Sequence, residues 1–218
     1  MSVDSWSRES EYWQHAPIWA GRPTVFLLGG GDSLRGFDIE RLRGRRILAV
    51  NSSVRMAARI AGPEDVLYFS DTGWFDGHQA EIEAWPGLVF SVSRRAKGRM
   101  PDRVHRPQMF ECSAFDVPGK LRHGLSSGHI AVSLAIAGGA GRCVLLGYDM
   151  RLIGGRSHHH DDYGRTTEQD VLDGFLKGFA GWHRDALDVG VDVVNASPGS
   201  ALAEFPLVDL ADEMERTP

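Results

Sequence analysis

Residues 24–35 read TVFLLGGGDSLR, and this stretch decides how the rest of the chain is interpreted. Val25 to Leu28 are typical of a buried strand, and Gly29–Gly31 of a tight turn into a helix that Asp32 and Ser33 open. Glycines let backbone N–H groups approach a ligand closely, and the N-terminus of a helix favours negative charge. The stretch therefore predicts a loop that binds the phosphates of a nucleotide.

Apolar runs of strand length recur along the chain and alternate with helical patterns. The runs lie at residues 46–50, 66–70, 88–92, 142–146 and 191–194. The helical patterns lie at residues 36–43, 54–60, 74–85, 129–137, 166–188 and 208–214. Short apolar strands separated by helices are typical of a parallel sheet that is covered on both faces. We therefore predict an α/β fold: a Rossmann-like doubly wound, mostly parallel sheet with helices on both faces. It forms a single nucleotide-binding domain over residues 1–218.

Length, charge and cysteine content narrow the class of protein. The chain has 218 residues and a formal net charge of −5, so no overall positive field attracts nucleic acid or anionic lipid. No apolar run approaches the length of a membrane span, and the polar N-terminus lacks the apolar core of a signal peptide. Two cysteines are too few for a disulfide framework. We expect a cytoplasmic protein with no membrane partner, and the sequence leaves a homo-oligomer open.

Polar residues follow the ends of most of the expected strands. In doubly wound sheets the ligand lies beyond the carboxyl ends of the strands, where the strand order reverses. We therefore expect these residues, together with the start of the helix at 129–137, to surround the nucleotide. The predicted nucleotide-binding residues are Gly29, Gly30, Gly31, Asp32, Ser33, Asn51, Asp71, Ser126, Ser127, Gly128, Asn195 and Ser197.

The glycine loop departs from the common nucleotide motifs. A dinucleotide fingerprint requires a third glycine and an acid after the second strand, but Leu34 and Asn51 stand at those positions. The chain has no P-loop motif, and Ser127 follows Ser126 rather than standing in a Gly-x-Ser-x-Gly elbow. The sequence thus argues against an NAD oxidoreductase, a P-loop NTPase and a serine hydrolase.

A basic run interrupts the regular pattern near residues 93–123. Residues 93–106 contain six arginines and lysines against one acid, Asp102. Such a run is typical of an exposed loop, or of a lid that neutralises a phosphate or an anionic acceptor, a nucleic-acid strand included. We favour a basic insertion that acts as a lid. Its predicted phosphate or acceptor contacts are Arg94, Arg95, Lys97 and Arg99.

Residues 158–162 read HHHDD and come after the strand at 142–146 and Asp149, which follows its end. An imidazole with a pKa near neutrality can deprotonate an acceptor hydroxyl. Adjacent histidines in a rigid loop cannot all reach one ion, which disfavours a closed zinc site. His158 and His160 would point the same way in an extended segment and are the predicted bases. Asp149 completes the predicted catalytic set, as a ligand of ribose hydroxyls or of Mg²⁺.

Four short motifs, taken in order, resemble a family of nucleotide-dependent transferases. They are GGGDSL at 29–34, AVN at 49–51, SSG at 126–128 and LLGYDM at 145–150. The family includes the archaeal 6-hydroxymethylpterin diphosphokinases and, more remotely, the bacterial sialyltransferases that use CMP-sialic acid. Residues 195–206, NASPGSALAEFP, are also similar to phage and prophage members of this group. Asp32 stands where the sialyltransferases carry a proline.

The resemblance implies a transferase whose donor is a nucleotide or a nucleotide sugar. We expect it to move a glycosyl group to a hydroxyl acceptor on a glycan or a nucleic acid. The first alternative is a Mg²⁺-dependent ATP diphosphokinase that acts on a small hydroxymethyl heterocycle. The second alternative is a nucleotide-binding protein without catalytic activity.

Overall fold

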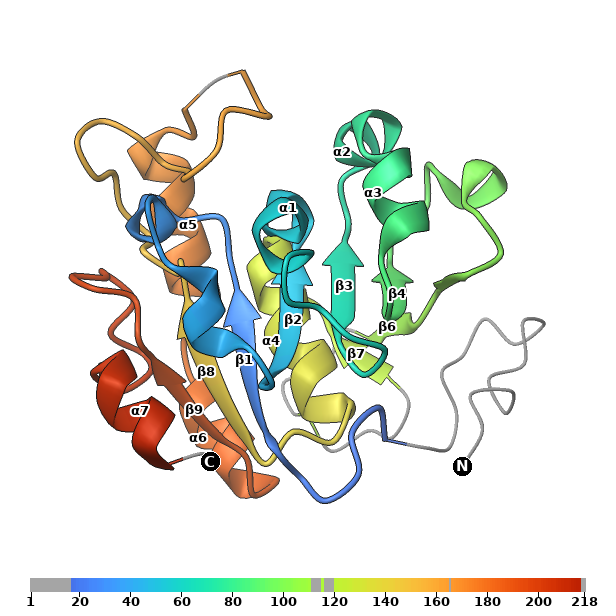
Figure 1. Ribbon diagram of the computed structural model, residues 1–218. Coiled ribbons are helices and arrows are strands. Elements are labelled where there is room, and N and C mark those ends of the chain that lie inside the picture. Colours follow the sequence, from blue (N-terminus) through green and yellow to red (C-terminus); the bar gives the residue numbers. More distant parts are fainter. Residues whose placement is uncertain (1–16, 111–114, 116–119, 165, 217–218) are drawn as a thin grey trace.

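A seven-stranded parallel sheet forms the centre of the molecule (Figure 1). The computed structural model describes residues 17–110, 115, 120–164 and 166–216. The strand order is β5-β4-β3-β2-β1-β8-β9, and each neighbouring pair is parallel. The strands are β1 Thr24–Leu28, β2 Arg46–Val50, β3 Val66–Phe69, β4 Leu88–Ser91, β5 Val104–His105, β8 Arg142–Leu146 and β9 Asp192–Asn195. This architecture confirms the predicted fold class.

Helices cover both faces of the sheet, because side chains of successive residues in a strand point to opposite faces. In β1, Val25 and Leu27 join the core cluster that contains α4, while Phe26 and Leu28 join the cluster that contains α1. The helices are α1 Val54–Ala57, α2 Thr72–Gly77, α3 Gln79–Ala84, α4 Ser127–Ala137, α5 Gln169–Gly178, α6 Trp182–Asp188 and α7 Leu210–Arg216.

The strand order reverses next to β1, and this reversal fixes the position of the candidate site. Leu28, the last residue of β1, pairs with Ala49 of β2 on one side and with Leu146 of β8 on the other. The segments that follow these three strands therefore leave the same edge of the sheet. Ligands of doubly wound folds bind at such an edge.

Several predicted helices are shorter than expected. The stretch at 36–43 forms only a 3-10 helix, Ile39–Leu42. The stretch at 166–188 is divided into α5 and α6 by Gly181, whose φ of 79° lies in the left-handed region. The stretch at 74–85 is divided into α2 and α3 at His78.

The predicted basic insertion contains regular structure. It provides the edge strand β5 and a separate two-stranded parallel sheet of β6 Gln108–Phe110 and β7 Lys120–Arg122. β5 pairs with β4, so part of the insertion extends the main sheet. The lid function stays a prediction. No helix in the described ranges combines the length and the apolarity that crossing a membrane requires.

Candidate functional site

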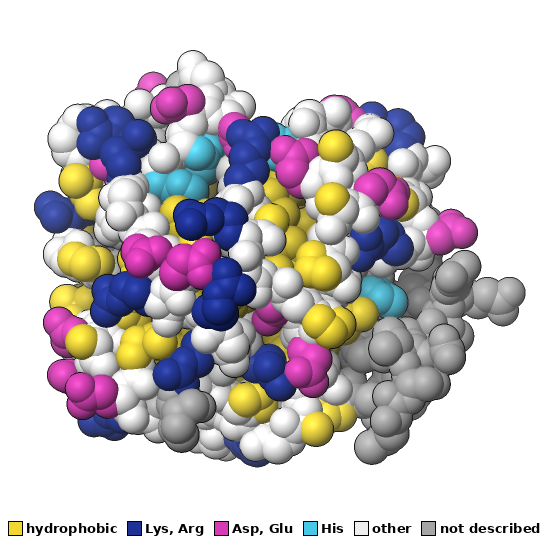
Figure 2. Space-filling model, in the orientation of Figure 1, with side chains coloured by type: hydrophobic (Ala, Val, Ile, Leu, Met, Phe, Trp, Pro, Cys, Tyr) yellow, Lys and Arg dark blue, Asp and Glu magenta, His cyan; other side chains and the backbone are white. Residues whose placement is uncertain are grey.

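A cavity of about 720 Å³ lies beyond the carboxyl ends of the central strands. The segments that follow β1, β2, β3 and β8, and the first turn of α4, contribute to its wall. Histidine side chains gather at the same upper edge of the molecule in Figure 2. The cavity wall includes eleven of the residues predicted to act as ligands or bases: Gly29, Gly30, Gly31, Asn51, Asp71, Ser126, Ser127, Gly128, Asp149, His158 and His160.

The glycine loop follows β1 and packs tightly against the loop that follows β8. The Gly29 N–H donates to the carbonyl of Leu146 at 2.7 Å, and the Gly31 N–H donates to that of Gly147 at 2.8 Å. A Cβ on Gly31 would lie 2.6 Å from the carboxyl carbon of Asp149. These glycines are therefore required by the close approach of two loops, and two of the expected phosphate donors are already used within the protein.

Asp149 stabilises the same loop. Ser33 donates to it twice, from its backbone N–H at 2.8 Å and from its hydroxyl. Burial raises the pKa of Asp149, and the two hydrogen bonds from Ser33 oppose this shift. Each oxygen of Asp149 therefore accepts one hydrogen bond from Ser33, and the carboxylate holds the glycine loop in place. Within the described ranges, no group of three or more histidines, cysteines and acids is placed to hold a metal ion.

Asp32 lies outside the cavity wall and forms ion pairs. Arg156 binds both of its oxygens, at 3.0 and 2.9 Å, and Arg35 donates to one of them at 2.7 Å. The hydrogen bond from Arg156 is the largest cause that lowers the pKa of Asp32. Arg156 belongs to the segment that carries the histidines, so Asp32 connects the glycine loop to that segment.

A chain of hydrogen bonds crosses the floor of the cavity. The Asn51 amide donates to the Tyr163 hydroxyl at 2.9 Å and to the Ser127 hydroxyl at 3.4 Å. The Ser127 and Ser70 hydroxyls lie 2.6 Å apart. Asn51 adopts a φ of 49°, and its buried Oδ1 has no partner among the described residues. Asparagine tolerates this left-handed conformation, and its unpaired Oδ1 is available to accept a hydrogen bond at this position.

The N-terminus of α4 opens into the cavity. Ser126, Ser127 and Gly128 form part of the cavity wall, and Ser126 makes no side-chain capping bond to the helix. Its hydroxyl lies 2.8 Å from Nδ1 of the buried His129 instead. The first N–H groups of a helix have no partner within the helix, and the helix dipole adds positive potential there. This helix end can therefore bind an anion.

The three adjacent histidines differ in their surroundings. The backbone N–H of Asp162 donates to Nδ1 of His160 at 3.3 Å, so in the neutral ring Nε2 carries the proton. His159 Nε2 lies 3.2 Å from the Ser53 hydroxyl and outside the cavity wall. His158 Nδ1 lies 2.8 Å from the Ser157 hydroxyl, which can accept a proton from it, and in that tautomer Nε2 is the proton acceptor. His158 is therefore the best placed of the three to act as a base.

Burial lowers the pKa of all three histidines. The pKa falls to about 4 for His159 and for His160, and it is also lowered for His158. In each case burial removes the ring from water, and this disfavours the charged imidazolium. At neutral pH these rings are uncharged, and a neutral imidazole is the form that accepts a proton.

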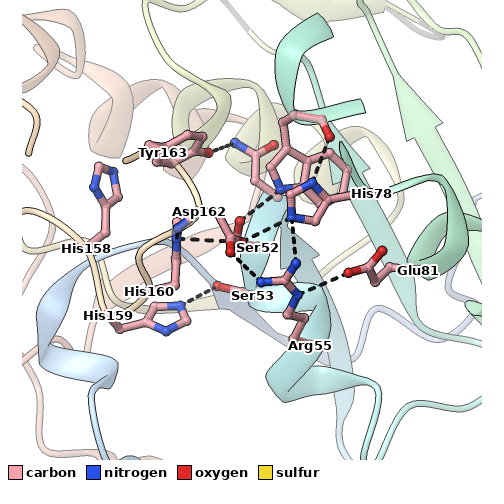
Figure 3. Close-up of polar contacts among 12 residues, drawn as sticks. Ser52, Ser53, Arg55, His78, Glu81, His158, His159, His160, Asp162 and Tyr163 are labelled. Atoms are coloured by element: carbon pink, nitrogen blue, oxygen red, sulfur yellow. Dashed lines mark hydrogen bonds and ion pairs between the residues drawn. The ribbon is translucent and has the colours of Figure 1, made fainter. Parts of the chain in front are cut away.

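Asp162 anchors the segment that carries the histidines (Figure 3). Arg55 donates to one of its oxygens, and His78 Nε2 lies 3.1 Å from the other. Arg55 also donates to Glu81 at 3.0 Å. Burial alone would raise the pKa of Asp162, but hydrogen bonds from Ser52, His78 and Arg55 hold it at about 2. The carboxylate therefore ties residues 158–163 to helices α1 and α2.

The remaining residues that were predicted to bind the nucleotide, its phosphates or the acceptor lie outside the wall of this cavity. Asn195 donates to the Ser200 hydroxyl at 2.9 Å, and the Ser197 hydroxyl accepts from the Tyr148 N–H at 2.8 Å, so both support the segment after β8. Arg99 forms an ion pair with Asp76. Arg94 and Arg95 form part of the wall of a neighbouring cavity. The side chain of Lys97 lies outside the described part of the structure.

Two polar residues of the floor were not singled out in the sequence. Tyr163 follows the HHHDD run directly, and Ser70 directly precedes Asp71. Burial raises the pKa of the Tyr163 hydroxyl to about 12, so it stays protonated and can donate a hydrogen bond. Their position next to predicted site residues could have identified them. A single tyrosine or serine in a loop is common at protein surfaces, so its residue type alone does not indicate a site.

The comparisons with known proteins concern the fold. No family model and no curated protein sequence matches the chain. The chain is similar to the sialyltransferase CstII from Campylobacter jejuni in complex with a substrate analogue, cytidine-5'-monophosphate. The TM-score is 0.53 at 14% sequence identity, over 85% of this chain and 84% of that chain. The fold is similar to that of a bacterial sialyltransferase.

A second structure gives the same result. The complex of CstII with CMP-3FNeuAc aligns with a TM-score of 0.52 at 13% identity, over 85% of this chain and 86% of that chain. At such low identity the similarity establishes the fold, and function has to be argued from the site. The sialyltransferase part of the predicted resemblance is thus confirmed at the level of fold. Its diphosphokinase and phage parts stay predictions.

Proposed function

We propose that the protein transfers a glycosyl group from a nucleotide sugar to a hydroxyl acceptor. The main support is the arrangement of three groups around one cavity. The His158 and Tyr163 rings lie 5.0 Å apart, and the N-terminus of α4 opens into the same space. A base, a hydrogen-bond donor and an anion site are the groups that glycosyl transfer from a phosphate ester requires.

In this proposal, the donor phosphate binds at the N-terminus of α4. The free N–H groups of the first turn and the Ser127 hydroxyl lie there, and Tyr163 is connected to Ser127 through Asn51. Since the Tyr163 oxygen accepts from Asn51, its own proton is available for a phosphate oxygen. The unpaired Oδ1 of Asn51 can accept from a hydroxyl or amine of the donor.

The transfer needs one new bond and one broken bond. The acceptor oxygen forms a bond to the anomeric carbon, while the bond between that carbon and the phosphate oxygen breaks. The electron pair of the broken bond stays on the phosphate, where Tyr163 and the α4 N-terminus stabilise the added charge. His158 Nε2 takes the proton of the acceptor hydroxyl.

Diphosphate transfer from ATP is the weaker candidate. That reaction relies on Mg²⁺ to neutralise the phosphates. Asp149, the acid predicted to bind this ion, already accepts two hydrogen bonds from Ser33.

A turnover assay tests the proposal. The purified protein is incubated with CMP-, UDP- and GDP-sugars, with and without a mixture of saccharide acceptors, and release of the nucleotide is followed by chromatography. We expect release from one donor class by the wild type and little release by His158→Gln. Binding of a nucleotide without turnover of any donor, in every acceptor mixture, would instead favour a non-catalytic nucleotide-binding protein.

A further inference from the structure

A second cavity of about 640 Å³ adjoins the first at the end of β3. Both cavities are bounded by Ser70, Asp71 and Gly73, so they meet along this segment. Arg94 and Arg95, which follow β4, form part of the wall of the second cavity. We infer that this second cavity is an acceptor subsite that binds the carboxylate or phosphate of an anionic saccharide. The inference rests on the proposed function, because it names the acceptor class of that same reaction.

The two arginines are free to bind a ligand. Both are exposed, and among the described residues neither has a carboxylate within the 4.0 Å of an ion pair. Neighbouring arginines differ: Arg99 pairs with Asp76, and Arg103 donates to three backbone carbonyls. A pair of unpaired guanidiniums at a cavity matches the geometry of carboxylate and phosphate groups.

The surrounding charges divide the subsite into two ends. Arg106 donates to the Ser93 carbonyl at 3.2 Å, so it adds positive charge beside the residue that precedes Arg94. His123 also lies in the wall. The only acid among the described wall residues is Asp71, at the junction with the first cavity, where its Oδ1 accepts from the Trp74 N–H at 2.7 Å. An anion is therefore favoured at the arginine end and disfavoured at the junction.

The spacing of the strands leaves room for an acceptor beside the donor. Neighbouring strands lie about 4.8 Å apart, so the ends of β1 and β4 are separated by roughly 14 Å. His158 lies near Gly30 after β1, and the two arginines lie after β4. A saccharide held by its anionic group at Arg94 and Arg95 can thus extend its hydroxyl across Asp71 into the first cavity. There the hydroxyl meets the anomeric carbon of the donor.

Matched ligand pairs test this inference. Methyl glucuronide and methyl glucoside differ only in a carboxylate, as do methyl galacturonide and methyl galactoside, and N-acetylglucosamine 6-phosphate is compared with N-acetylglucosamine. Each is titrated by ligand-observed NMR, with and without saturating CMP. The proteins are the wild type, Arg94→Gln with Arg95→Gln, and Arg41→Gln as the control. Arg41 is an exposed arginine of the 3-10 helix Ile39–Leu42, outside both cavities.

We expect at least one anionic saccharide to bind tenfold or more tightly than its neutral partner. This preference should disappear in the double variant and persist in Arg41→Gln, while CMP binding is unchanged in both. The inference is overturned if no anionic saccharide binds, if the preference survives in the double variant, or if the double variant loses CMP binding. The last result would assign the arginines to the donor phosphate. Anionic selectivity without binding of any nucleotide would contradict the proposed function and leave the subsite standing.

Discussion

Three consecutive histidines have three different environments, and this difference is the clearest feature at the scale of single residues. His160 is held by the backbone N–H of Asp162, and His159 lies beside Ser53. Both His158 and His160 line the cavity and have a lowered pKa, but the Asp162 N–H makes Nδ1 of His160 the acceptor and leaves the ring proton on Nε2, whereas Nδ1 of His158 can donate to the Ser157 hydroxyl and leave Nε2 as the acceptor. The sequence could limit the base to His158 or His160, but the choice depends on whether the partner of Nδ1 is a backbone N–H, as in His160, or a hydroxyl, as in His158.

Replacement of His158 tests its assignment as the base. His158→Gln removes the proton acceptor and keeps a polar side chain of similar reach. A positioned general base contributes about 10² to 10⁴ in rate, so we expect kcat to fall by that factor with little change in nucleotide affinity. His160→Gln is the matched control and should lose less than about tenfold. Equal losses in the two variants would contradict the assignment.

The pH dependence of the reaction follows from the same residue. His158 must be neutral to accept a proton, and burial places its pKa below the ordinary value of about 6.5. Activity is therefore constant near neutrality and falls as the pH drops through the lowered pKa. The acid limb of a pH profile of kcat/KM should lie below about pH 6.5 and should be absent in His158→Gln. An acid limb above neutrality would exclude this residue as the base.

At the scale of elements, the glycine loop and the histidine segment are packed together rather than independent. Gly29 and Gly31 donate to the loop after β8, and Asp32 pairs with Arg156 of the histidine segment. The sequence predicted a turn into a helix that Asp32 and Ser33 open, with N–H groups free to approach a ligand. The structure contains a 3-10 helix of three residues, Asp32–Leu34, because these local contacts replace a regular first turn.

The substitution Gly31→Ala tests whether the glycine loop must lie close to the loop that follows β8. The added Cβ would lie 2.6 Å from Asp149 and 2.7 Å from the Gly147 carbonyl, so Gly31→Ala should destabilise the protein by about 1 to 3 kcal/mol. Gly174→Ala in α5 meets no atom within 4 Å and should stabilise the protein by about 0.4 to 1 kcal/mol. Urea unfolding measures both values. A neutral Gly31→Ala would show that the two loops can separate at no cost.

The anchoring of the histidine segment can be tested at Asp162. Asp162→Asn removes the charge that pairs with Arg55 and His78 while keeping the shape of the side chain. The Arg55 side chain is 51% exposed, so solvent screens this pair, and we expect the loss of the charge to cost about 1 kcal/mol. We expect a lower melting temperature and faster amide hydrogen exchange across residues 151–163. The adjacent, exposed Asp161→Asn should change neither property, and equal effects of the two variants would argue against the anchor.

Strands were predicted more accurately than helices, for a physical reason. A parallel strand buried on both faces requires an unbroken apolar run, as in Arg46–Val50, and few other elements have that pattern. Helix ends depend on tertiary contacts. Thr166 to Asp188 carries a continuous amphipathic pattern, yet Gly181 adopts a left-handed φ and divides it. The edge strand β5 is two residues long and carries no periodic signal.

At the scale of the whole molecule, the sheet explains why the site could be predicted in outline. Any polar residue just after a parallel strand reaches one edge, so Asn51, Asp71 and Asp149 come together from distant positions. The remaining features depend on the three-dimensional path of the loops. Tyr163 reaches Asn51 across 112 positions of sequence, and Asp149 uses its oxygens on Ser33. Neither contact has a local pattern in the sequence.

The central claim is that the first cavity binds a nucleotide through its phosphate beside Asn51 and the N-terminus of α4. Asn51→Asp tests it with an isosteric change, because aspartate also tolerates a positive φ and adds one negative charge.

Calorimetric titration compares CMP, UMP, GMP and AMP with their nucleosides in the wild type and in Asn51→Asp. We predict that at least one nucleotide binds the wild type and loses tenfold or more in affinity in the variant, while its nucleoside binds both equally. If no nucleotide binds the wild type, or if the variant binds nucleotide and nucleoside as the wild type does, the claim is wrong.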